Sequence, residues 1–267
     1  MTVQLDRKEI ERLLAQEEYK PIERLDKSTL DAEEKAQVRE VEQVVSFGQE
    51  IIELFDWFLE SQDTLPTQKQ YVNAGINKML AWFATNKPEI EVTTVMVEAC
   101  KLRLTRTYMS KVIELHFEAC LRESMPHLKI ISHPLIDSVM GVDIVAEDDV
   151  KRYYIHITSN TPMARKMLRE KESRGGLRVG NAFIKYTRDF EGDLMLMYDI
   201  HEESETTKII NGFPLFRPDF IEWRLNLAST SSTAGELLSV PYSKLDHFID
   251  WAKHQLKQDI QLSEGAF

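Results

Sequence analysis

Two short apolar runs, residues 141–147 and 152–158, constrain the fold more than any other feature of the sequence. They read GVDIVAE and RYYIHIT, and the polar stretch EDDVK lies at their connection. Alternation with a period of two is typical of β-strands, and a short polar connection favours an antiparallel hairpin. On paired strands, Asp143, His156 and Thr158 are expected to converge on one face. The sequence therefore predicts a hairpin with three polar side chains on one side.

Helical periodicity dominates the chain before this hairpin. Apolar residues recur at helical spacing across residues 31–62, which we expect to form one long helix. A second helix is expected over 64–88, and a third over 92–124 with a break near 105–110. Residues 1–90 are therefore expected to form a helical N-terminal region.

The pattern changes after about residue 125, where β-rich segments begin. LKIISHPLI precedes the hairpin, and NAFIKYTR and DLMLMYDI follow it as further strand candidates. MARKMLREKES predicts a helix that Gly175 and Gly176 end, and YSKLDHFIDWAKHQLKQ predicts an amphipathic helix near the C-terminus. Residues 91–267 are therefore expected to form a second domain that mixes helices and strands, of α+β or α/β class.

The composition excludes several classes of protein. No apolar run approaches the ~20 residues that a helix needs to span a bilayer, and the N-terminus has no apolar signal region. Cys100 and Cys120 are too few for a disulfide framework, and the absence of a Cys-x-x-Cys motif excludes a zinc knuckle. We therefore expect a cytoplasmic, reduced protein with no membrane partner.

Charge is distributed unevenly along the chain. The formal net charge of −11 argues against a nucleic-acid partner when it is taken alone. However, residues 1–63 hold 17 acidic and 8 basic side chains, whereas residues 161–188 hold 8 basic and 2 acidic ones. The acidic helical region is a candidate surface for a protein partner or for self-association. The basic segment is either a solvated helix face or a surface that contacts DNA phosphates.

Six side chains of the basic segment are the candidates for contacts with double-stranded DNA: Arg165, Arg169, Lys171, Arg174, Arg178 and Lys185. Such contacts neutralise phosphates and position a protein on the duplex without reading its sequence. No helix-turn-helix or finger motif that could read bases is recognisable in the sequence.

The polar residues of the hairpin suggest a divalent metal site. A carboxylate from Asp143 beside a neutral imidazole of His156 can bind a metal that activates water for attack on a phosphodiester. In the helix before the strands, Glu114 and Glu118 lie four residues apart on one face and could complete the ligand set. The alternative is that Asp143 is an acid near a turn, His156 is a core histidine bonded to a carbonyl, and both glutamates are surface acids.

The order of these features resembles the core of the restriction-endonuclease-like, or PD-(D/E)XK, superfamily. MSKVIELHFEACL is similar to the first core helix, and GVDIV is similar to the strand that carries the metal-binding aspartate. YYIHITS occupies the place of the acid-x-Lys strand, and a basic helix follows it. The resemblance covers roughly residues 108–200. It implies a mixed central sheet flanked by helices, with Asp143 as the metal-binding acid.

Two positions depart from the pattern of the family. His156 stands where the family has an acid or glutamine, and Thr158 stands where it has the lysine that positions or activates the attacking water. Some members take the lysine from a neighbouring element, and Lys166 is the candidate here, with Lys171 next. An imidazole ligand moves the metal preference from Mg²⁺ towards Mn²⁺.

Three functions are compatible with these patterns. The leading one is a metal-dependent endonuclease that hydrolyses phosphodiester bonds in DNA, with Asp143, His156 and Lys166 as catalytic residues. The second is a catalytically silent protein of the same fold that serves as a DNA- or protein-binding module, because Thr158 replaces the lysine. The third is a helical scaffold whose acidic region binds another protein.

Overall fold

The computed structural model describes residues 5–21, 25–43, 45–62, 64–132, 142–149, 152–162, 164–166, 176–179, 182–185 and 194–230. The chain is of mixed α and β class, as expected, and it divides into two compact units. The first unit comprises Met1–Leu115 and Ile210–Phe213, and the second comprises His116–Ile209 and Pro214–Phe267.

The first unit is built from helices: α1 (Arg7–Leu14), α2 (Ala32–Gln43), α3 (Val45–Gln62), α4 (Gln68–Asn86) and the first part of α5 (Thr94–Ser124). Helix α4 confirms the second predicted helix, and it begins at a capping box. Thr67 accepts the main-chain N–H of Gln70, and the side chain of Gln70 accepts the N–H of Thr67. The single helix predicted over 31–62 is described as α2 and α3, and residue 44 between them lies outside the described residues.

Helix α5 is continuous over 31 residues, so the break predicted near 105–110 is wrong. Thr105 and Thr107 in this stretch are β-branched, and such residues have a lower helix propensity. Packing outweighs that propensity, because Leu104, Tyr108 and Val112 are all fully buried on one side of the helix. The hydroxyl of Thr107 donates to the carbonyl of Arg103 at 3.0 Å, which keeps this polar group compatible with the helix.

Aromatic rings form much of the core of the first unit. The ring of Tyr71 lies 5.8 Å from that of Phe55 and 5.6 Å from that of Tyr108. Phe213 extends the cluster, with its ring 6.1 Å from Tyr108 and 5.4 Å from Tyr19. Such tilted and edge-on pairs stabilise a core beyond the area that they bury.

Strands β7 (Thr207–Ile210) and β8 (Phe213–Phe216) form a hairpin whose turn belongs to the first unit. Asn211 and Gly212 both have positive φ, 46° and 86°, as a two-residue turn of the type favoured in hairpins requires. The side-chain amide of Asn211 donates to the carbonyls of Leu14 and Ala15 at 3.0 and 2.7 Å. The turn therefore satisfies carbonyls that the end of α1 leaves without helical partners.

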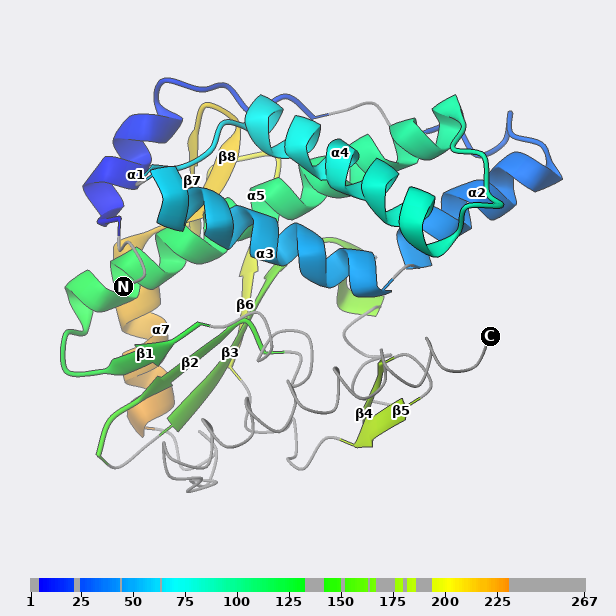
Figure 1. Cartoon of the computed structure of the whole chain (residues 1–267). Helices are drawn as coiled ribbons and strands as arrows, with labels where there is room; N and C mark the ends of the chain where they lie inside the picture. The colour runs from blue at the N-terminus through cyan, green and yellow to red at the C-terminus, as the bar shows by residue number, and fades with distance from the viewer. Residues whose placement is uncertain are drawn as a thin grey trace. The chain divides into compact units, whose positions relative to one another are not determined.

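The second unit contains a four-stranded mixed sheet (Figure 1). Its strands are β1 (Lys129–Ile131), β2 (Ile144–Glu147), β3 (Arg152–Ser159) and β6 (Leu194–Tyr198), which lie in that order across the sheet. The β1–β2 and β2–β3 pairs are antiparallel, whereas the β3–β6 pair is parallel. The β2–β3 pairing confirms the predicted hairpin. Strands β4 (Gly176–Val179) and β5 (Ala182–Lys185) form a separate two-stranded sheet.

One face of the mixed sheet packs on aromatic side chains. The ring of Tyr198, on β6, lies 5.9 Å from that of Phe216, and Phe216 lies 5.5 Å from Phe117 of α5. Phe216 precedes helix α7 (Pro218–Thr230) and stacks on Phe220 at 6.1 Å. Phe216 thus connects β6 of the sheet to helices α5 and α7. Among the described residues, no helix is long and apolar enough to cross a membrane.

Candidate functional site

Asp143 directly precedes β2. Its contacts with β3 replace the regular main-chain hydrogen bonds between the two strands. Its main-chain N–H donates to the carbonyl of Ile155 at 3.1 Å. Its carboxylate oxygen Oδ2 accepts the main-chain N–H of Ile157 at 2.5 Å. The two contacts fall on either side of His156. The Asp143 carboxylate therefore accepts a main-chain hydrogen bond from β3 just beyond the last register pair of β2 and β3.

Asp143 lies beside His156 at the point where the β2–β3 register ends. The last register pair is Ile144 with Ile155, and Asp143 directly precedes it in a bend. The contacts of Asp143 with Ile155 and Ile157 flank His156 along β3. His156 is 4% exposed, so its imidazole lies in the interior rather than in solvent. The structure thus places Asp143 next to the segment of β3 that carries His156, and the shared face that the alternation predicts stays a prediction.

Thr158 is the next residue of β3 on the same face as His156. It is partly buried and pairs with Met197 of the parallel strand β6. A threonine hydroxyl can donate and accept hydrogen bonds, but it carries no positive charge. Any cation near this face must come from another part of the chain.

Each of the two glutamates of α5 is held by a base on the same helix. Glu118 is 8% exposed and forms an ion pair with Arg122, four residues further along. Glu114 belongs to the first unit and lies 2.6 Å from Lys111 Nζ. In the described part of the chain, no three His, Cys, Asp or Glu side chains gather closely enough to hold a metal ion. The contacts of Asp143 with Ile155 and Ile157 therefore place it beside His156, whereas each glutamate is held in an ion pair on its own helix.

A short helical turn follows β3 and carries two of the predicted cations. The hydroxyl of Thr161 accepts the N–H of Ala164 at 3.1 Å, and the carbonyl of Thr161 accepts the N–H of Arg165 at 3.0 Å. Arg165 and Lys166 are both exposed. These contacts set the start of the turn two residues after the end of β3.

The other predicted DNA-contacting residues are only partly described. Arg169, Lys171 and Arg174 lie outside the described residues. Arg178 is in β4, where it pairs with Phe183, and Lys185 is in β5, where it pairs with Gly176. Their main-chain positions thus place both in the separate two-stranded sheet.

Sequence reasoning missed two polar residues at the same edge of the sheet. Asn160 directly follows β3 and Asp199 directly follows β6, and the Asn160 amide donates to Asp199 Oδ1 at 2.9 Å. The carboxyl ends of neighbouring parallel strands meet at one edge of a sheet, where polar side chains of α/β proteins commonly gather. The parallel pairing of β3 with β6, which the sequence alone does not predict, was the missing signal.

The start of β2 and the ends of β3 and β6 therefore converge at one edge of the sheet. This edge carries Asp143, His156, Asn160 and Asp199, and the turn with Arg165 and Lys166 follows it directly. In comparisons with protein-family models, curated proteins and solved structures, no match to the chain is found.

Proposed function

We propose that the chain acts on double-stranded DNA as a metal-dependent endonuclease built on a restriction-endonuclease-like core. The order of elements supports this proposal: α5, β1, the strand that Asp143 begins, β3 and then a turn with basic side chains. The mixed sheet with helices packed against it also agrees with the core that the sequence resembles.

One observation carries the proposal, namely that Asp143 directly precedes β2 and bonds to Ile155 and Ile157, the two neighbours of His156 on β3. A carboxylate oxygen and an imidazole nitrogen are both donors that divalent ions accept. Because Asp143 contacts β3 on both sides of His156, this is our candidate for a phosphodiester-cleaving site among the described residues.

The two donors fit an ion that keeps part of its water shell. Mg²⁺ and Mn²⁺ sites on phosphoryl enzymes commonly use one or two carboxylates and complete their coordination with water and substrate phosphate oxygens. Hydrogen bonding of a ligating carboxylate is normal, because such contacts orient the ligand. The bond from Ile157 N–H to Asp143 is compatible with this role. His156 should favour Mn²⁺ over Mg²⁺.

The roles of the chain's own residues follow from their positions. Asp143 and His156 would hold the ion, which when bound polarises a phosphate and lowers the pKa of a bound water. The exposed side chains of Arg165 and Lys166 would bind the DNA backbone and place it at the sheet edge. Because Thr158 has no charge, Lys166 is our candidate for the cation beside the scissile phosphate.

A second candidate function is a catalytically silent DNA-binding protein of the same fold. A specific observation favours it: the Asp143 carboxylate already accepts the main-chain N–H of Ile157 on β3. This structural role needs no metal. Glu114 and Glu118 are likewise held in ion pairs. Under this alternative, His156 is a buried structural histidine and the cations of 161–188 still bind phosphates.

Cleavage assays on plasmid and linear duplex DNA, with Mg²⁺ and with Mn²⁺, separate the two functions. The informative variant is Asp143→Asn, because asparagine keeps an oxygen that accepts the Ile157 N–H while it removes the negative charge. Asp149→Asn is the matched control, because Asp149 is an exposed acid in the β2–β3 connection. Lys166→Ala and Thr158→Ala test the source of the cation.

The endonuclease proposal expects Mn²⁺-stimulated cleavage that is lost in Asp143→Asn, retained in Asp149→Asn, and reduced more by Lys166→Ala than by Thr158→Ala. Cleavage that survives Asp143→Asn would come from another site or from a contaminant. DNA binding without cleavage under either metal would favour the silent relative. The absence of both binding and cleavage would reject both functions.

A further inference from the structure

The parallel strands β3 and β6 are tied together beyond their last register pair. Ser159 pairs with Tyr198, and the N–H of the next residue, Asn160, donates to the carbonyl of Tyr198 at 2.8 Å. The side-chain amide of Asn160 then donates to Asp199 Oδ1 at 2.9 Å. Asn160 itself is exposed, so burial does not hold its side chain in place. The contact with Asp199 is what orients it.

Asp199 is anchored in turn by the segment that leads to β7. Its main-chain N–H donates to Thr207 Oγ1 at 3.0 Å, and Thr207 is fully buried. Hydrogen bonds from the side chains of Asn160 and then Ser204 hold the pKa of the Asp199 carboxyl below its ordinary value. These hydrogen bonds favour the ionised form of the carboxylate that Asn160 meets.

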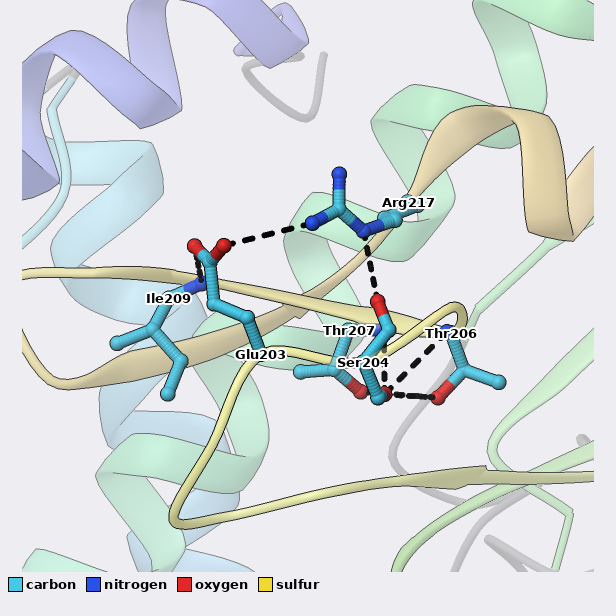
Figure 2. A network of polar contacts seen from close by, with 6 residues as sticks. All are labelled: Glu203, Ser204, Thr206, Thr207, Ile209 and Arg217. Carbon is cyan, nitrogen blue, oxygen red and sulfur yellow. Dashed lines mark hydrogen bonds and ion pairs between the residues drawn. The ribbon is translucent and has the colours of Figure 1, made fainter.

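Ser204 lies at the centre of a polar network that fixes this segment (Figure 2). Its hydroxyl accepts the N–H groups of Thr206 and Thr207 at 3.3 and 3.2 Å. Arg217, just before α7, donates from Nε to the Ser204 carbonyl at 2.9 Å and reaches Glu203 at 3.5 Å. The loop that carries Asp199 is thus attached to the start of a helix rather than left mobile in solvent.

On its other side, Asn160 is joined directly to the cationic turn. Thr161 follows it, and the N–H of Thr161 donates to the Ser159 carbonyl at 2.9 Å. Thr161 also accepts the N–H groups of Ala164 and Arg165, which sets the first turn of the helix. An unbroken set of contacts therefore runs from Arg217 through Asp199 and Asn160 to Arg165.

We propose that Asp199 is a positioning residue that acts through Asn160 to hold the 161–166 turn, so that Arg165 and Lys166 meet the phosphates of duplex DNA. The contact with DNA rests on the proposed function, whereas the ordering of the turn does not. A turn that is already ordered loses less conformational entropy on binding, which raises affinity without a new contact. Removal of the Asp199 carboxylate should therefore weaken DNA binding although Asp199 touches no phosphate.

The first test uses hydrogen exchange of the Ala164 and Arg165 amides, measured by NMR without DNA. Asp199→Ala should accelerate exchange at both amides, whereas Asp199→Asn should exchange almost as slowly as the wild type, because asparagine still accepts from Asn160. Asn160→Ala removes the same bond from the other side and should reproduce Asp199→Ala. It also serves as the second variant if Asp199→Ala does not fold. Glu202→Ala, an exposed acid of the same loop, is the matched control and should leave both amides unchanged.

The second test is a double-mutant cycle on affinity for a duplex of about 20 base pairs. Asp199→Ala and Arg165→Ala should each weaken binding, by about three- to tenfold for Asp199→Ala. If Asp199 acts through the turn, the double variant should bind only slightly more weakly than Arg165→Ala alone. The salt dependence of binding should fall in Arg165→Ala, because fewer phosphates are neutralised, and should stay close to that of the wild type in Asp199→Ala, which keeps both cations.

Wild-type exchange rates at Ala164 and Arg165 in both Asp199→Ala and Asn160→Ala would overturn the proposal. Fully additive losses in the double variant would overturn the route through Arg165. If the wild-type protein has no affinity for duplex DNA, the proposed function fails, and the exchange rates still decide whether Asp199 holds the turn.

Discussion

The carboxylate of Asp143 accepts the main-chain N–H of Ile157 at 2.5 Å, across the start of β2. This bond gives the aspartate a structural task at the position where the sequence predicts a metal ligand. The two roles are compatible, because a carboxylate has two oxygens and several lone pairs. The two roles differ in what they require. The hydrogen bond from Ile157 needs only an acceptor oxygen, whereas metal binding needs the negative charge of the carboxylate.

The first prediction separates these two requirements by stability. Asp143→Ala should lower the free energy of unfolding by about 1–3 kcal/mol, because the partly buried N–H of Ile157 loses its acceptor. Asp143→Asn should cost less than about 1 kcal/mol, since its amide oxygen can accept the same N–H. Urea unfolding followed by circular dichroism measures both. Equal losses in the two variants would show that the charge, and not the acceptor, stabilises this edge.

The second prediction concerns Asn211, which caps α1 from the β7–β8 turn. Asn211→Ala should destabilise the fold by about 2–3 kcal/mol, because it loses two bonds to α1 carbonyls and places a methyl side chain at a φ of 46°. Asn211→Gly tolerates that φ and loses only the bonds, so it should cost clearly less. Thermal and urea unfolding of the pair give the comparison. A glycine variant less stable than the alanine variant would contradict this account of the turn.

The third prediction concerns the pH dependence that Glu17 contributes. Burial raises the pKa of its carboxyl above the ordinary 4.5, against the lowering effect of hydrogen bonds from Gln68 N–H and then Tyr108 Oη. A raised pKa means that the folded state binds this proton more tightly than the unfolded state does. Its contribution to stability is therefore greatest below the ordinary pKa and falls as pH rises through the raised one.

Glu17→Gln removes this titration, because a glutamine still accepts the Gln68 N–H but cannot ionise. The free energy of unfolding of Glu17→Gln should fall less steeply with pH than that of the wild type, over the window that begins near pH 4.5. Glu18→Gln, at the exposed neighbouring position, is the control. Urea titrations at several pH values test this, and parallel curves for wild type and Glu17→Gln would refute it.

The fourth prediction concerns the salt dependence of DNA binding. Charge reversal at Arg165, Arg169 and Arg174 should weaken binding to all duplex sequences alike and reduce the dependence of log K on log salt by about one per lost phosphate contact. Lys69→Glu, an exposed cation on α4, is the control and should change affinity little. Fluorescence anisotropy at several salt concentrations provides the slopes. Unchanged affinity in the triple variant would leave 161–188 as a solvated surface.

The β2–β3 hairpin was predictable from the sequence, because its signal is local. Period-two alternation on both sides of a polar turn specifies the pairing, which runs from Ile144 with Ile155 to Glu147 with Arg152. Helix α4 was predictable for a similar reason, since Pro66 and Thr67 mark its start. In these places the nearest residues along the chain determine the structure.

Other features depend on contacts that are distant in sequence. The parallel partner of β3 lies some forty residues further along the chain, so neither the β6 pairing nor the Asn160–Asp199 bond could be read locally. The continuity of α5 depends on buried neighbours that outweigh local propensity. The β7–β8 hairpin is different, because its turn, Asn211-Gly212, is itself a strong local turn signal in the sequence. This hairpin was therefore predictable from the sequence.

Calorimetric titration of Mn²⁺ into the wild type and into Asp143→Asn, both confirmed as folded, tests the central claim most directly. The metal-site account predicts saturable binding near one ion per chain in the wild type, and an affinity at least about tenfold weaker in Asp143→Asn. Asp149→Asn should bind as the wild type does. Equal Mn²⁺ affinity in the wild type and Asp143→Asn, or no saturable binding in the wild type, would contradict a metal site at Asp143.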